Sequence, residues 1–480
     1  MNRKWVIIIA ICSFLLGAGG VYGGLTWVAP LWADDADQLE VQVGDEDGLK
    51  GNLQKISHAY DIIRNAYVEK VEDEKLIQGA IQGMVGTLQD PYSVYMDAAT
   101  TEQFNDSMDT SFDGIGAQIS LKDGKLIIIA PIKNSPAEKA GIKAKDQITK
   151  IDGKSVDGLD AHQASLLIRG KKGTTVQLEI VRGDLANPLI FEITRDEIPL
   201  LTVYSEMKNN GDKNIGYIEI TQFAKGTAKE FSTELKKLEK QGIEGLIIDV
   251  RGNPGGMLSS VEAIMRELVT GEKPYVQIEE RSGKRVTYAS DLKENKDYPI
   301  SVLIDEGSAS ASEILAGALN EIEGYELIGE KTFGKGTVQQ ALPLDEHSQI
   351  KLTMAKWLTP NGNWIHGKGI EPTIEVQQPA SFHVHSLQIE ETLVKDMNNE
   401  KVKIAQNVLK ALSFAPGRTD GYFDEQTEQA VRAFQSIHKL PITGQIDVKT
   451  ALKMEEAIES KIQNEKNDLQ LQVALKSFAK

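Results

Sequence analysis

The sequence of 480 residues contains a single cysteine, Cys12, which excludes a disulfide within the chain and a metal site built on cysteines. Basic residues are also in deficit, with 53 Lys and Arg against 70 Asp and Glu, and no basic stripe occurs. Because phosphate binding needs clustered positive charge, nucleic acid is disfavoured as a partner. His383 and His385 form no ligand pattern with nearby carboxylates. We therefore predict no metal and no cofactor.

Charged residues are absent from Trp5 to Ala33, a run that follows Arg3 and Lys4 and precedes Asp34. Positive charge before the run and negative charge after it favour a segment that enters the membrane with its N-terminus inside. The run exceeds the apolar core of a signal peptide, about 7–15 residues, and about 20 residues suffice to span a bilayer. We predict an uncleaved anchor, with a cleaved signal as the alternative. In both cases the rest of the chain is exported.

The rest of the sequence predicts a multidomain α/β protein. Apolar residues recur at three- and four-residue steps over residues 53–89, which indicates helices, and short strands dominate residues 100–197. Strands and helices alternate over residues 198–380, which is typical of a sheet with helices on its faces. The expected parts are a membrane segment at 1–33, a tether and helical region at 34–99, a β-rich domain at 100–197, an α/β core at 198–380, a linker at 381–399, and a helical module with a polar terminal helix at 400–480.

Ser310 stands at an expected strand-to-helix turn, between the apolar run Ile300–Ile304 and the helix-like residues Ile314–Leu319. A serine at such a turn exposes its hydroxyl. The first N–H groups of the helix point toward a position where a developing oxyanion can be stabilised. The turn therefore suits a serine nucleophile.

Lys335 lies between Gly334 and Gly336, where a lysine can lose its water shell and become a neutral base. A free lysine has a pKa of about 10.4, so its deprotonation at pH 7 costs roughly 4–5 kcal/mol. Burial can lower that pKa by about 3–5 units. A role as base therefore requires Lys335 to be buried and without a carboxylate partner. The alternative is a solvated loop lysine beside a turn of small residues.

The sequence contains, in this order, the segments LIIDVRGNPGG, GSASASEI, GEKTFGKGTVQQ and GKGIEP. Together they resemble the carboxy-terminal processing proteases, which are serine peptidases with a Ser-Lys dyad. The resemblance covers roughly residues 50–380. It implies an α/β protease core in which Ser310 is the nucleophile, Lys335 the general base, and Gln339 the residue that orients the lysine. On an alternating strand, residues at the spacing of Lys335 and Gln339 would share a face.

The same mechanism needs backbone N–H groups around the oxyanion. Ala311, directly after the serine, can supply one. The glycine turn after the strand-like run Leu246–Val250 can supply another, from Gly255 or Gly256. A glutamine at position 339 can hold the lysine amine through its carbonyl without adding a charge that would keep the amine protonated.

Gly114, Ile115 and Gly116, with the short strands that follow, resemble part of a PDZ domain. Consecutive N–H groups of a glycine-bearing loop can hold the terminal carboxylate of a peptide, and an exposed strand edge can accept the peptide as an added strand. We therefore predict that these three residues bind a substrate. Arg169 ends a helix-like run, where the helix dipole favours a cation. It can also sense a bound peptide or couple this module to the core.

Residues 400–458 resemble a small three-helix peptidoglycan-binding module, through the texts AQNVL, DGYFDEQT, AVRAFQ and TGQID. Such a module can bind glycan, form a dimer contact or serve as a spacer. Peptidoglycan is therefore a candidate partner, and we expect a homodimer.

Three other kinds of active site do not fit the residues around Ser310 and Lys335. The segment around Lys335 approaches a phosphate loop, but Gly336 replaces the Ser or Thr that binds magnesium, and a strand-like pattern follows. No G-x-S-x-G elbow surrounds Ser310, as an α/β-hydrolase triad needs. A β-lactamase-type site has its lysine three residues after the serine, where Glu313 stands.

The sequence therefore predicts a membrane-tethered serine endopeptidase on the extracytoplasmic face of a bacterial membrane. Its expected substrates, by the resemblance, are proteins or peptides with exposed C-terminal tails. The alternative is a non-catalytic cell-envelope scaffold that binds peptides and peptidoglycan.

Overall fold

The computed structural model describes residues 46–479, apart from residues 110, 123, 133, 183–187, 385, 386, 388 and 390. The expected membrane segment at 1–33 and most of the tether lie outside the described residues. None of the described helices is long and apolar enough to cross a bilayer. The chain divides into two compact units between Met84 and Val85. The first unit contains α2 (Glu46–Ala66) and most of α3 (Asp73–Gly86), in agreement with the predicted helices.

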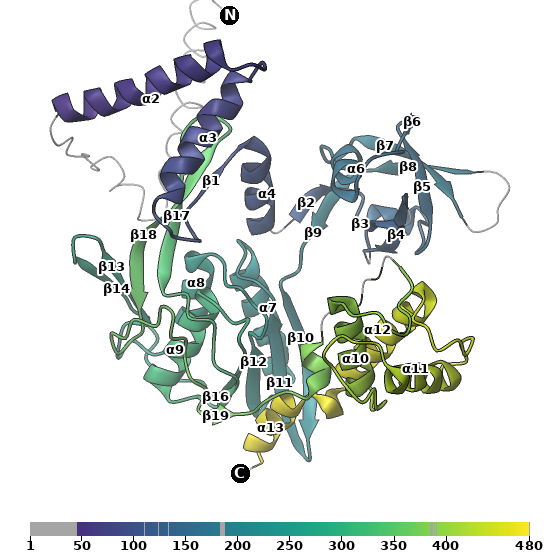
Figure 1. The fold of residues 1–480 in the computed structure, drawn as a ribbon. Helices are drawn as coiled ribbons and strands as arrows, with labels where there is room; N and C mark the ends of the chain where they lie inside the picture. Colours follow the sequence, from purple (N-terminus) through teal and green to yellow (C-terminus); the bar gives the residue numbers. More distant parts are fainter. Residues whose placement is uncertain are drawn as a thin grey trace, which may run out of the picture. The chain divides into compact units, whose positions relative to one another are not determined.

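The second unit is built around a six-stranded sheet with the order β10-β11-β12-β15-β16-β19, in which the last five strands run parallel (Figure 1). Its strands are β10 (Val203–Asn210), β11 (Lys213–Ile220), β12 (Gly245–Asp249), β15 (Ile300–Ile304), β16 (Glu326–Gly329) and β19 (Ile374–Glu375). All residues of β12 and β15 are buried, as expected for parallel strands covered on both faces. The carboxyl ends of β12, β15 and β16 meet at one edge, where such sheets gather their sites.

Helices cover both faces of this sheet. One core holds alternate sheet residues such as Ile248 and Val302, together with the helices α7 (Thr227–Lys240), α8 (Leu258–Leu268) and α9 (Ala311–Glu323). The intervening residues Ile247 and Leu303 point to the other face, where α13 (Leu469–Ser477) packs on them (Figure 1).

A terminal helix is present within the predicted residues 460–480, but it is shorter than predicted and one of its faces is apolar. The segment comprises the end of α12, a short 3-10 turn at Glu465–Asn467, and α13. Leu471, Leu475 and Phe478 are buried against the six-stranded sheet. The overall composition of this segment is polar, but the apolar residues of its short helix lie on one face. A prediction from overall polarity therefore misses that face.

A second sheet brings distant segments beside the loop of Lys335. Its order is β1-β18-β13-β14, and β17 also pairs with β18. Its strands are β1 (Val94–Met96), β13 (Val276–Glu280), β14 (Arg285–Tyr288), β17 (Thr337–Pro343) and β18 (Gln349–Leu358). The pairing of Val94 with Lys351 fixes the residues before β1 near this sheet. The helix α4 (Ala98–Met108) follows β1.

The β-rich domain has a sheet of its own, with the order β3-β4-β5-β7-β8 and β6 on β5. Its elements are β3 (Ala117–Lys122), β4 (Lys125–Pro131), α5 (Pro136–Lys139), β5 (Gln147–Ile151), β6 (Lys154–Ser155), α6 (Ala161–Ile168), β7 (Thr175–Val181) and β8 (Leu189–Thr194). Ile128, Ile148 and Leu178 belong to its separate core. The strand β2 (Ser111–Gly114) precedes this sheet in the sequence and β9 (Asp196–Pro199) follows it. These two strands pair as a two-stranded ribbon.

A short 3-10 turn, η2 (Ala380–His383), precedes the C-terminal module. The module contains α10 (Glu400–Ala411), α11 (Glu425–Ile437) and α12 (Val448–Gln463), which share one apolar core. Each helix begins at an N-cap whose side chain accepts a backbone hydrogen bond, namely Asn399, Asp424 and Asp447. The predicted sequence of three helices is therefore present.

Candidate active site

Ser310 lies at the turn between β15 and α9, as predicted, and its side chain is partly exposed. Its φ of 55° and ψ of −110° are costly for a residue with a side chain, a feature that clusters at active sites. Its N–H donates to Glu313 Oε2 at 2.8 Å. Ala311 is the first residue of the helix, so its N–H has no intrahelical acceptor and can serve an oxyanion.

Gly255 lies against this turn, and both Gly255 and Gly256 have a conformation that only glycine adopts readily. Their φ values are 98° and 146°. A Cβ on Gly255 would stand 2.9 Å from Ser310 Cβ, and a Cβ on Gly256 would stand 2.2 Å from the Phe223 carbonyl oxygen. The Gly255 N–H donates to Asn253 Oδ1 at 2.8 Å. Because that amide is already used, Gly256 is the better of the two alternatives for an oxyanion donor.

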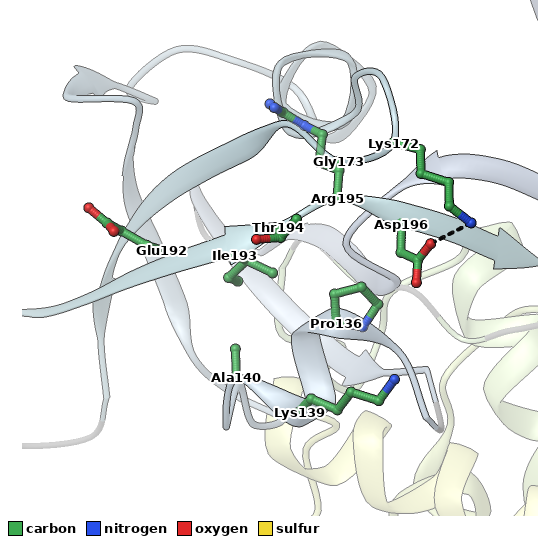
Figure 2. Close-up of a pocket in the computed structure, with 10 residues that line it drawn as sticks. All are labelled: Pro136, Lys139, Ala140, Lys172, Gly173, Glu192, Ile193, Thr194, Arg195 and Asp196. Carbon is green, nitrogen blue, oxygen red and sulfur yellow. Dashed lines mark ion pairs between the residues drawn. The ribbon is translucent and has the colours of Figure 1, made fainter.

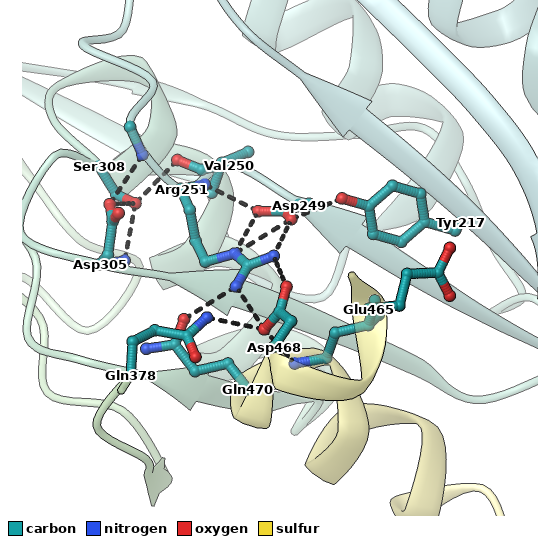
Figure 3. Close-up of polar contacts among 12 residues, drawn as sticks. Tyr217, Asp249, Val250, Arg251, Asp305, Ser308, Gln378, Glu465, Asp468 and Gln470 are labelled. Atoms are coloured by element: carbon teal, nitrogen blue, oxygen red, sulfur yellow. Dashed lines mark hydrogen bonds and ion pairs between the residues drawn. The ribbon is translucent and has the colours of Figure 1, made fainter. Parts of the chain in front are cut away.

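Hydrogen bonds join the turn after β12 to the turn after β15. The Ala309 N–H and the Ser312 hydroxyl donate to the Asn253 carbonyl at 3.0 and 2.9 Å. The Ser308 hydroxyl donates to the Val250 carbonyl at 2.8 Å (Figure 3). These hydrogen bonds thus fix the turn after β12 relative to the turn that carries Ser310.

Glu313 connects the turn of Ser310 to the loop of Lys335. Its side chain is fully buried. Oε2 accepts from the N–H groups of Ser310 and Lys335, both at 2.8 Å, while Oε1 accepts from the Thr332 hydroxyl at 2.6 Å and the Gly334 N–H at 2.7 Å. A single carboxylate therefore fixes the backbone of the serine and of the lysine relative to one another.

Lys335 lies in the loop after β16 and is partly buried. Burial lowers the pKa of its amine, and the nearby charge of Lys351 lowers it further, while Glu313 and Asp90 act in the opposite direction. Among the described residues Lys335 has no ion pair, and no hydrogen bond joins its Nζ to Ser310. The pKa of the amine is therefore shifted in the direction that a base requires, and the two side chains are not hydrogen-bonded to each other.

Gln339 lies within β17, whereas Lys335 precedes that strand. A bulge also shifts the register between Val338 and Gln339. The prediction that Lys335 and Gln339 share a face of one alternating strand was therefore wrong. The Gln339 amide donates to the Thr337 and Thr353 hydroxyls at 2.9 and 3.2 Å, which leaves its carbonyl oxygen as the atom that could meet an amine.

Two residues of this site were missed by the sequence analysis. Glu313 follows Ser310 in the Ser-x-x-Glu spacing of a capping box, a signal that could have placed its carboxylate at the start of the helix. Tyr92, whose ring centroid lies 4.9 Å from Lys335 Nζ, carried no local signal beyond a turn. Its role depends on a contact between segments far apart in the sequence.

Known proteins resemble this chain over nearly its whole length. Carboxy-terminal processing protease CtpB of Bacillus subtilis is 53% identical over 478 residues, which are 100% of this chain and 99% of that protein. The chain belongs to the carboxy-terminal processing proteases. It is accordingly a serine-type peptidase. Carboxy-terminal processing protease CtpA of the same organism is 42% identical over 475 residues, 99% of this chain and 96% of the relative.

Family models match this protease in four places. They describe peptidase family S41 at residues 214–376, the activating protease CtpB N-terminal domain at 14–100, a PDZ domain at 114–189 and a peptidoglycan binding domain at 398–454. Among solved structures, the photosystem II D1 C-terminal processing protease is 27% identical, with a TM-score of 0.41 over 67% of this chain and 92% of that one.

In the PDZ domain of this protease, the predicted carboxylate loop lies beside Arg169. The side chain of Ile115 is buried, so its backbone is what a ligand could meet. The Phe112 ring lies between the two features. A Cβ on Gly114 would stand 3.0 Å from that ring, and the Arg169 guanidinium lies 4.8 Å from the ring centroid. Gly116 has a φ of 74° and leads directly into β3, an edge strand of the sheet.

Two cations stand at the C-terminus of α6, because Arg169 is its C-cap residue and Arg195 contacts its last carbonyls. Arg195 Nε donates to the Ile168 carbonyl at 2.7 Å, and another of its nitrogens donates to the Leu167 carbonyl at 3.3 Å. These bonds satisfy carbonyls that the helix end leaves open. Both interpretations of Arg169 therefore stay open, as a cation at the helix C-terminus and as a side chain beside the glycine loop.

A pocket of the PDZ domain lies at the opposite edge of its sheet, between α5 and β8 (Figure 2). Lys172 and Asp196 form an ion pair across part of its rim at 2.8 Å. None of the predicted substrate-binding residues lines it. The carboxylate loop and β3, rather than this pocket, remain the candidate peptide site.

A polar network links the glycine turn to the C-terminal segment (Figure 3). Arg251, which follows β12, donates to the carboxylate of Asp249 and to both oxygens of Asp468, at 2.9 and 2.8 Å. It also donates to Gln470 Oε1 at 3.0 Å, and Gln378 Nε2 donates to Asp468 at 2.7 Å. Asp468 is the N-cap of α13, so the residue next to the glycine turn anchors the helix that covers the sheet.

Proposed function

We propose that this protease cleaves peptide bonds with Ser310 as the nucleophile and Lys335 as the general base. The proposal rests on the Glu313 carboxylate, which binds the backbone of both residues, and it is supported by the lowered pKa of the lysine. Ser310 Oγ would attack the scissile carbonyl while its proton passes to Lys335 Nζ. The resulting ammonium would then protonate the leaving amine, and water would hydrolyse the acyl-enzyme with the same lysine as base.

The oxyanion of each tetrahedral intermediate would accept hydrogen bonds from the Ala311 and Gly256 N–H groups. The Gln339 carbonyl would orient the lysine amine. Because the amine is not hydrogen-bonded to Ser310 in this structure, the reaction requires a movement of the lysine side chain toward the serine.

The dyad is tested by measuring the cleavage of casein and of a tail peptide by purified Ser310→Ala and Lys335→Ala variants. We expect both variants to be inactive with unchanged circular dichroism, and Gln339→Ala to be weakened. Full turnover by Lys335→Ala would refute the dyad. Inactivity of the wild type toward every protein substrate would instead favour a scaffold.

We further propose that the PDZ domain binds the C-terminal tail of a protein substrate, or is moved by such a tail to activate the core. Support comes from the glycine loop, the open edge of β3 and the adjacent Arg169. Tail recognition predicts that removing a tail from a substrate raises its KM. Gated activation predicts that a separate tail peptide raises kcat on an unrelated substrate. In both cases Arg169→Ala should impair the cleavage of long substrates while the fold is retained, and unchanged turnover would contradict either role.

We propose that the protease acts on extracytoplasmic substrates from the outer side of a bacterial membrane, held there by residues 1–33 as an anchor or released after cleavage. The charge pattern around that apolar run supports this location. Fractionation of cells that express the full chain, with protease accessibility of intact spheroplasts, tests it. Recovery of the protein in the cytosol would refute it.

The match to a peptidoglycan binding domain supports peptidoglycan as a partner, and exposed apolar side chains of α2, such as Leu53 and Ile56, support a homodimer. Co-sedimentation with purified peptidoglycan and light scattering of the purified chain test these two proposals separately. A chain that stays in the supernatant, or a monomeric mass, would refute the corresponding proposal.

A further inference from the structure

The turn before β1 places an aromatic ring at the candidate base. Tyr92 is partly buried, and its ring centroid lies 4.9 Å from Lys335 Nζ. Asp90 builds the turn, since its carboxylate accepts from the Tyr92 N–H at 3.1 Å and from the Ser93 hydroxyl at 2.6 Å. The Thr353 N–H on β18 donates to Ser93 Oγ at 3.0 Å. The position of the ring is thus fixed by the turn and the second sheet, independently of the lysine.

An aromatic face attracts an ammonium group but has no comparable attraction for a neutral amine. The contact with Tyr92 therefore favours the protonated form of the lysine. We propose that Tyr92 is a positioning residue that sets the pH at which Lys335 becomes available as the base. The inference rests on the proposed Ser-Lys dyad and deepens it.

The other charged groups around Lys335 have opposite effects on its ammonium form. Lys351 on β18 disfavours the ammonium, whereas Glu313 on α9 and Asp90 in the turn favour it. His366 faces the same turn, with its ring centroid 6.2 Å from that of Tyr92. Glu313 and Asp90 are already engaged by backbone and hydroxyl donors, and neither forms an ion pair with the lysine among the described residues. The Tyr92 ring is thus in direct contact with the amine, and it attracts the ammonium form more strongly than the neutral form.

The test compares pH profiles of kcat/KM for the full chain on a fluorogenic tail peptide. Tyr92→Leu keeps an apolar group of moderate size but removes the aromatic face. Its acid limb should move to lower pH by roughly 0.4 to 1.5 units, because the lysine loses its stabilised ammonium state. Tyr92→Phe keeps the face and is the matched control, with a midpoint close to that of the wild type. A midpoint of Tyr92→Leu that is unchanged, or that moves to higher pH, would overturn the proposal.

A second series keeps the proposal testable if Tyr92→Leu does not fold. Phenylalanine analogues with one, two or more ring fluorines at position 92 nearly preserve shape while progressively weakening the negative face. We expect the acid limb to move stepwise to lower pH with each added fluorine, and the absence of a trend would refute the role of the ring. Lys335→Ala separates the two ideas. If it is inactive and no trend appears, the role of Tyr92 fails alone. If it remains active, the dyad itself fails.

Discussion

Replacing Glu313 by glutamine should separate the two catalytic segments without changing the size of the side chain. If the new NH2 group took the place of Oε2, it would face the N–H groups of both Ser310 and Lys335. In place of Oε1 it would face the Thr332 hydroxyl, which can accept a hydrogen bond, and only one N–H, that of Gly334. The second orientation is therefore favoured, and it leaves one buried donor without an acceptor.

An unsatisfied buried donor costs about 1–3 kcal/mol, and loss of the charge weakens the remaining bonds, so we expect Glu313→Gln to reduce the free energy of unfolding of the core by about 2–4 kcal/mol. Because the nucleophile and the base then lose their common anchor, kcat should fall by about 10–100-fold while KM changes little. Urea unfolding followed by tryptophan fluorescence measures the first effect. Trp357 is a suitable probe, since its indole N–H donates to the Lys335 carbonyl at 2.8 Å.

Glu306 on the same turn is exposed, and Glu306→Gln is the matched control, expected to stay within about 0.5 kcal/mol of the wild type. A Glu313→Gln enzyme with normal kcat and normal stability would refute the view that this carboxylate organises the site. A loss of stability with normal kcat would limit its role to folding.

The remaining predictions concern the base, the glycine turn and the C-terminal anchor. Lys335→Arg should be inactive at every pH between 6 and 10, because a guanidinium stays charged; activity that returns at high pH would contradict a base at this position. Gly256→Ala should lose both activity and stability, since its Cβ would stand 2.2 Å from the Phe223 carbonyl oxygen, and a crystal structure with an unshifted turn would contradict this. Burial alone would raise the pKa of Asp468, but hydrogen bonds from Arg251 lower it, so its contribution to stability is present above its unfolded pKa of about 3.9 and is lost as the pH falls through the lower folded value. Asp468→Asn should therefore unfold about 1–3 kcal/mol more easily at pH 7 and lose less stability than the wild type between pH 5 and 2; parallel acid profiles would contradict the anchor.

Local patterns in the sequence predict much of the fold. The uniformly apolar strands, the helical periodicities and the glycine-bearing turns are properties of short segments, so Ser310 and Lys335 could be placed in the correct turn and loop. The alternation of strands and helices over residues 198–380 also predicted the α/β core that holds both segments.

Contacts between distant segments could not be predicted in the same way. Glu313 stood in a recognised motif, but its bond to the Lys335 N–H depends on how two loops converge. The relation of Lys335 to Gln339 depended on a bulge, which alternation cannot reveal. The role of Arg195 at the end of α6 required the β8–β9 segment to return beside that helix.

The docking of α13 has a consequence for how the enzyme is made. The strands of the six-stranded sheet lie between Val203 and Glu375. One apolar face of this sheet stays uncovered until the chain has been synthesised through Phe478. A nascent chain therefore holds Ser310 and Lys335 before α13 covers the sheet and brings Asp468 to Arg251. A chain truncated before Asp468 would keep this apolar face exposed and would lose one of the two carboxylates that Arg251 contacts.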